Sequence, residues 1–205
     1  ISPSATAAEI FQAFAGKQYV WRLTKSDTAQ ASMFLQIARE HAANSVALLS
    51  GFNMYSNSFF SWFGFYAAEN GYLDGAVAVD RYEQDLMGSN GDEPRERMLD
   101  AQPDRLFVVP ESPAQLRCML RVYVRYGLGH INQTQLFFAD KGYNLAVLSD
   151  FGTSIDGVSG FALGSPPASG FDAAYRRQFD VLTVPANVAN AYDAMMLAAY
   201  GLEIS

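Results

Sequence analysis

The chain has 205 residues, of which 50% are apolar and 17% are charged, and its formal net charge is −7. This apolar content excludes a disordered chain, because enough apolar surface is present to offset the entropy lost on ordering. With 14 Lys and Arg residues against 21 Asp and Glu residues, the chain is not expected to bind nucleic acid or an anionic membrane surface.

Extended and helical patterns alternate along the chain. The extended segments are short and largely apolar, which is typical of strands buried on both faces of a parallel sheet. In chain order we expect them at Tyr19–Leu23, Val46–Leu49, Ala76–Val79, Leu106–Val109, Leu136–Ala139 and Val158–Leu163. Helical patterns follow the N-cap cluster Ser26–Thr28, cover about Ser58–Asn70, Pro94–Ala101 and Phe171–Phe179, and open at Pro113 and Pro185. This alternation predicts an α/β fold, a three-layer sandwich with a mainly parallel sheet.

Two of these helices have an apolar stripe that predicts their buried face. The stripe of the helix after Ser26–Thr28 is Met33, Phe34, Ile37 and Ala38. The stripe of the helix that opens at Pro113 is Leu116, Met119, Leu120 and Tyr123. Another face of this second helix carries a basic ladder, Arg117, Arg121 and Arg125, which indicates a solvated surface.

The segment Ser58–Asn70 is rich in aromatic side chains. Its expected buried face is Phe59, Phe60, Phe63 and Tyr66, with Trp62 and Phe65 pointing elsewhere. A helix that is apolar on all sides must be covered by something. Two alternatives stay open: burial by the rest of this chain, or an interface with a missing domain or another subunit, such as a homodimer through residues 58–70.

Sequence motifs of enzymatic chemistry are not evident. The chain has no dinucleotide-binding or phosphate-binding glycine loop and no nucleophile elbow. His41 and His130 lack a second ligand at metal-binding spacing. The single cysteine, Cys118, has no activating neighbour nearby in sequence. We therefore expect no enzyme, no metal and no cofactor.

Several segments carry a resemblance to a known family. They are Ile1–Thr6, Tyr19–Arg22, Ser26–Gln30, Ser45–Leu49 with Tyr55, Pro103–Val109, Leu116–Gly127, Gly157–Pro166 and Asn190–Ala194. In order and spacing they resemble the central stretch of the type I periplasmic solute-binding proteins. These are the branched-chain amino acid binding proteins of ABC importers and the related receptor ligand-binding regions.

The resemblance implies a fold of two α/β lobes that hold a ligand in the cleft between them. Residues 1–205 match a single α/β lobe, the second one, with edge segments of the first lobe at 1–20 and about 170–205. The opening part of a family member has no counterpart here, so the chain is expected to be a fragment of a longer gene product. The family also implies a periplasmic or extracellular location, with a lipid anchor as an option for the full-length protein.

Three candidate ligand-binding residues come from the first half of the chain. By resemblance, Ser4 and Thr6 belong to the loop that holds the α-carboxylate and the amino group of an amino acid. Tyr55 matches the aromatic residue that covers the ligand from the second lobe.

Three further candidates follow later strands of the predicted sheet. Glu111 comes just after the strand that ends at Val109. Either Asp140 or Lys141 matches the acidic residue that pairs with the ligand's ammonium group. In parallel α/β sheets ligands bind beyond the carboxyl ends of the strands, where Tyr55, Glu111 and Asp140 are all expected.

Three positions depart from the pattern of the family. Ser56 stands where the family usually has glycine, Lys141 puts a positive charge where an acid is expected, and Pro110 replaces a loop residue that contacts the ligand. These departures leave a carboxylate or another ligand that is not an amino acid as an alternative to an α-amino acid.

Taken together, the sequence predicts a solute-binding protein or a fragment of one. It would capture a small polar ligand, such as an amino acid, for the membrane components of an ABC importer. The alternative is a binding-protein-like sensor or protein-interaction module of a receptor ectodomain or a cell-envelope regulator. A lobe alone is expected to bind weakly, because half of the ligand contacts are absent.

Overall fold

A computed structural model of the chain describes residues 2, 5–14, 21–73, 76–81, 102–126, 134–162, 170–182, 184 and 188–204. The chain divides into two compact units. One unit is Asp27–Phe161, and the other combines Ile1–Ser26 with Ala162–Ser205. The predicted helix Pro94–Ala101 lies outside the described residues.

The larger unit is built around a sheet of five parallel strands in the order β2-β1-β3-β4-β5. The strands are β1 (Val46–Ser50), β2 (Val77–Arg81), β3 (Arg105–Val109), β4 (Gln135–Phe138) and β5 (Ser159–Gly160). In the register of the sheet, Leu48 lies between Val79 and Phe107 on the neighbouring strands. Because all strands run the same way, their carboxyl ends share one edge of the sheet.

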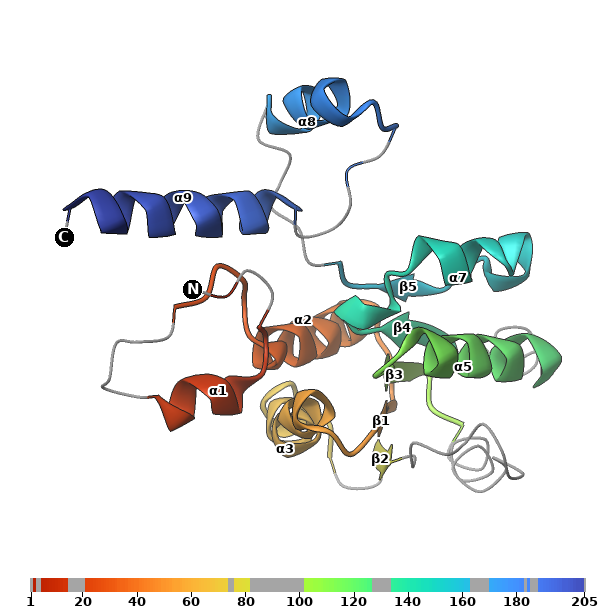
Figure 1. The fold of residues 1–205 in the computed structure, drawn as a ribbon. Coiled ribbons are helices and arrows are strands. Elements are labelled where there is room, and N and C mark those ends of the chain that lie inside the picture. Colours follow the sequence, from red (N-terminus) through yellow and green to blue (C-terminus); the bar gives the residue numbers. More distant parts are fainter. Residues whose placement is uncertain are drawn as a thin grey trace. The chain divides into compact units, whose positions relative to one another are not determined.

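Helices cover both faces of this sheet (Figure 1). They are α2 (Asp27–Glu40) and α3 (Met54–Glu69) on one face, and α5 (Pro113–Tyr126) and α7 (Leu145–Ser149) on the other, with the short 3-10 helices η1 (Asp140–Gly142) and η2 (Gly152–Ile155). Side chains of β1 alternate between the two cores, since Leu48 packs with α2 and α3 whereas Ala47 packs with α5. The predicted three-layer α/β sandwich is confirmed.

Aromatic side chains fill the core between the sheet and helices α2 and α3. Phe34 of α2 stacks on Phe107 of β3 with ring centroids 4.7 Å apart and 11° between the planes. Phe59 and Phe63 of α3 are also fully buried, and Phe59 meets Phe107 edge to face. The ring of Phe34 therefore packs between the helix layer and the sheet at the centre of this core.

The buried faces of α2 and α5 can be compared with their predicted stripes. On α2 the prediction was wrong for Met33, which is 46% exposed, because the stripe that meets the sheet is Ala31, Phe34, Leu35 and Ala38. On α5 the prediction holds: Leu116, Leu120 and Tyr123 are buried and Met119 packs against them. In the basic ladder, Arg117 forms a surface ion pair with Asp150 at 2.9 Å.

The start of α3 differs from the prediction. The helix begins at Met54, four residues earlier than expected, because the side chain of Asn53 accepts a hydrogen bond from the Ser56 N–H at 2.9 Å and caps the helix. Phe60 is 40% exposed and does not join the buried face of Phe59 and Phe63. Its ring instead packs against the guanidinium of Arg81, whose Cζ lies 4.5 Å from the ring centroid.

The smaller unit contains the helices α1 (Ala8–Ala13), α8 (Phe171–Phe179) and α9 (Val188–Ile204). Its extended part is a parallel bridge between Ser2 and Arg22, in which the Ser2 N–H donates to the Trp21 carbonyl at 2.7 Å. Helix α8 has the predicted bounds. The ring centroid of its Phe171 lies 5.5 Å from that of Tyr192 in α9. No helix within the described residues has both the length and the apolar character that a membrane crossing requires.

Candidate functional site

Three of the predicted ligand residues come together at the carboxyl edge of the sheet. Tyr55 lies on α3 after β1, and Asp140 and Lys141 lie on η1 after β4. The Tyr55 hydroxyl donates a hydrogen bond to Oδ1 of Asp140 at 2.5 Å. Nζ of Lys141 lies 3.9 Å from the centroid of the Tyr55 ring, within the range of a cation–π contact. We call Tyr55, Asp140 and Lys141 the rim cluster.

Gln30 of α2 fixes the backbone and the side chain of Asp140. Its Nε2 donates to Oδ1 of Asp140 at 2.9 Å, and its Oε1 accepts from the Asp140 N–H at 2.9 Å. Gln30 itself is buried. These two bonds join α2 to the turn after β4, across 110 residues of sequence. Sequence reasoning did not identify Gln30, because no local pattern marks a partner so distant.

The turn that carries Lys141 depends on a glycine. Gly142 is buried, and a Cβ atom at this position would overlap the Cβ of Phe138 in β4. A residue without a side chain is therefore required for η1 to fold back onto the strand. This close packing fixes where Lys141 leaves the backbone.

The rim cluster also perturbs the ionisation of Tyr55, which is 7% exposed. Burial, the charge of Asp140 and the hydrogen bond to Asp140 raise the pKa of the Tyr55 hydroxyl well above its usual value of 10.0. The buried carboxylate of Asp27 adds to this rise, while a backbone hydrogen bond from Lys141 opposes it. At neutral pH the hydroxyl is thus a stable donor to Asp140.

Glu111 has partners of its own and is not part of the rim cluster. Its Oε1 accepts hydrogen bonds from the Asn53 N–H at 3.0 Å and from the Ser56 hydroxyl at 2.7 Å, so the carboxylate lies at the N-terminus of α3. A negative charge there stabilises the helix. Gly51 leaves room for it, because a Cβ at this position would overlap the Glu111 carboxylate. Ser56, which departs from the glycine of the family, thus has a physical reason to be there.

The other two predicted residues lie in the smaller unit or outside the described residues. Thr6 is buried in the smaller unit, where its carbonyl accepts a hydrogen bond from Nη1 of Arg22 at 3.2 Å. Ser4 lies outside the described residues. No group of three or more His, Cys, Asp and Glu side chains within the described ranges could hold a metal ion.

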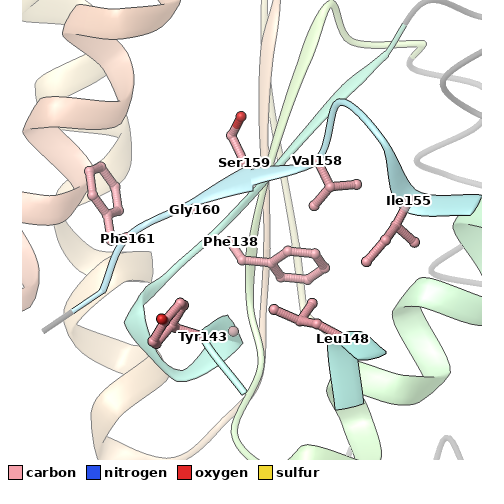
Figure 2. Close-up of a pocket in the computed structure, with 9 residues that line it drawn as sticks. Phe138, Tyr143, Leu148, Ile155, Val158, Ser159, Gly160 and Phe161 are labelled. Atoms are coloured by element: carbon pink, nitrogen blue, oxygen red, sulfur yellow. The ribbon is translucent and has the colours of Figure 1, made fainter. Parts of the chain in front are cut away.

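A pocket of about 210 Å³ lies on the α7 side of β4 and β5 (Figure 2). The side chains of Phe138, Leu148, Ile155 and Val158 point toward one another there, and the Ser159 hydroxyl points away. None of the predicted ligand residues lines this pocket. Its lining is mostly apolar and contains no charged side chain that would recognise a polar solute.

Several solved structures with this architecture are described as bacterial binding proteins. A leucine-binding protein from Thermotoga maritima superposes with a TM-score of 0.77 at 18% identity, over 98% of this chain and 56% of that one. An ABC transporter substrate-binding protein from Desulfitobacterium hafniense, in complex with Leu, gives 0.71 at 19% identity, over 100% and 57%. A solute-binding protein of an ABC transporter from Rhodopseudomonas palustris, in complex with p-hydroxybenzoic acid, gives 0.72 at 15% identity, over 96% and 53%.

These comparisons establish the fold. No protein-family model and no curated protein sequence matches the chain. The chain spans little more than half the length of the structures it resembles. It has the fold of a type I periplasmic binding protein lobe.

Proposed function

We propose that this chain forms the second lobe of a solute-binding protein, together with edge segments of the first lobe, and that it captures a small polar ligand without catalysing a reaction. In this proposal Asp27–Phe161 is the core of the second lobe, and residues 1–20 and about 170–205 belong to the first. The observation that carries the proposal is the position of the rim cluster. It lies at the carboxyl edge of an all-parallel sheet, where α/β proteins bind their ligands.

The rim cluster has the features of a binding edge. Its members come from two elements, α3 after β1 and η1 after β4, and Gln30 of α2 holds Asp140 in place from a third element. Such an arrangement is preorganised, so little ordering entropy is lost when a ligand arrives. Ser4, Thr6 and Glu111 remain in the proposal as ligand residues, although Glu111 also caps α3.

Transport is the biological role that we infer for this binding. Proteins of the same fold are described as ABC transporter substrate-binding proteins, some with an amino acid bound and some with an aromatic acid bound. By this analogy the chain delivers its ligand to the membrane components of an ABC importer from the periplasm or the extracellular space, where a lipid anchor would hold the full-length protein. Ligand contacts with both lobes would stabilise a closed state.

The direct test is ligand-detected NMR on the 205-residue chain, with leucine and 4-hydroxybenzoate as the first probes. We expect saturation transfer to at least one probe with an affinity in the millimolar range, because one lobe supplies part of the contacts. Addition of a second binding probe should reduce the signal of the first. Binding in the micromolar range would contradict the division of the site between two lobes. The absence of transfer to any small polar solute would contradict the proposal itself.

Exposed aromatic side chains on α3 and in the loop before it favour a second candidate function, protein interaction. Phe52, Phe60 and Phe65 are 53%, 40% and 54% exposed, although they are large apolar side chains. Phe52 and Phe60 both contact the guanidinium of Arg81, and exposed apolar side chains that lie together are typical of a protein-binding face. A sensor or a homodimer through residues 58–70 would use this face. Self-association in solution would support the homodimer, and a monomer at every concentration would contradict it.

A further inference from the structure

The charged group that the rim cluster exposes is an ammonium. Lys141 is exposed, and its Nζ rests on the face of the Tyr55 ring. The ion pair that the structure records within the described residues joins Arg117 and Asp150, so Lys141 has no carboxylate partner among them. Its three N–H donors are therefore available to a solute at this edge.

The carboxylates of the same region are less accessible than Lys141. Oδ1 of Asp140 already accepts hydrogen bonds from Tyr55 and from Gln30. Asp140 is half-buried, and Asp27 is fully buried. A ligand ammonium at Asp140 would be left with Oδ2 of a half-buried carboxylate and would lie close to the like charge of Lys141, the next residue, and it could not reach Asp27.

The position of Lys141 is fixed by the fold and not only by its own side chain. The two bonds to Gln30 hold the preceding residue, and the contact between Gly142 and Phe138 holds the following one. The cation–π contact with Tyr55 then restrains the end of the side chain. A cation that is held in place in this way loses little side-chain entropy when an anion binds.

From these contacts we propose that the ligand of this lobe is a small carboxylate without an α-ammonium group, and that Lys141 binds its carboxylate. This inference rests on the proposed function, because it specifies the ligand of the same rim. The ring of Tyr55 contacts the ammonium of Lys141, and its hydroxyl donates to Asp140, so Tyr55 positions Lys141 and does not itself recognise the ligand.

Pairs of probes that differ only in the amino group test the inference. Leucine is compared with 4-methylpentanoate and phenylalanine with 3-phenylpropanoate by ligand-detected NMR on the 205-residue chain. The carboxylate of each pair should bind more tightly than its amino acid. Lys141→Glu should weaken carboxylate binding about tenfold to hundredfold, the value of one charge-assisted hydrogen bond, and remove the preference.

A matched control separates the local effect from net charge. Arg121→Glu makes the same change of charge on an exposed position of α5 and should leave the binding of all four probes unchanged. Tighter binding of the amino acids, or carboxylate binding that Lys141→Glu does not weaken, would overturn the inference and leave solute capture standing. If no probe of either kind bound, both the inference and the proposed function would be overturned.

Discussion

Phe34→Ala is expected to lower the free energy of unfolding by about 3–5 kcal/mol. Phe34 is 1% exposed and lies between α2 and the sheet. Its ring stacks on Phe107 and also contacts Phe137 and Phe63, with centroids 5.6 and 6.0 Å away. Removal of the ring leaves a cavity among other rigid rings, which cannot collapse to fill it.

Denaturation with urea, followed by circular dichroism, measures this effect. Phe65→Ala is the matched control, because it removes the same atoms from a ring on α3 that is 54% exposed. This control should change the free energy of unfolding by about 1 kcal/mol or less. Equal losses for the two variants would show that Phe34 is not at the centre of the core.

Asp140→Ala should lower the free energy of unfolding by about 2–4 kcal/mol. The variant leaves two donors without their acceptor, the Tyr55 hydroxyl and Nε2 of Gln30, and both residues are buried. An unpaired buried donor loses the hydrogen bonds it makes with water in the unfolded chain, and nothing in the folded chain replaces them.

The same denaturation experiment checks this second prediction. Asp150→Ala is its control, since that carboxylate is 54% exposed and pairs with Arg117 at the surface. The control should cost less than about 1 kcal/mol. In a Tyr55→Phe background, Asp140→Ala should lower the free energy of unfolding by less than it does alone, because one of the two donors that it leaves unpaired, the Tyr55 hydroxyl, is already absent. Additive losses would mean that Tyr55 and Asp140 do not depend on each other.

Much of the fold could be predicted because its signals are local. The run Val46–Leu49 became β1, and the stripe after Pro113 became the buried face of α5. Apolar runs and helical spacing report burial directly, since each strand or helix meets the core through side chains that are neighbours in sequence or one turn apart.

The details of α3 and of the site depended on contacts between distant residues. Glu111, 58 residues from Asn53, accepts a hydrogen bond at the start of α3. The guanidinium of Arg81 in β2 packs against the exposed ring of Phe60. Gln30 reaches Asp140 across 110 residues. No pattern within a helix or strand encodes such pairs. The cap at Asn53 is the exception, because an asparagine before an apolar helix is a local signal that would have placed the helix start correctly.

The ligand is expected to bind at the carboxyl edge of the sheet, at Tyr55, Asp140 and Lys141. Amide chemical shifts of the chain, recorded during a titration with 4-methylpentanoate, show whether it does. We expect the largest shifts at Tyr55 and at 140–142, with none on the outer face of α3. Shifts confined to the pocket beside Ile155 and Val158, or to Phe60 and Phe65, would contradict it.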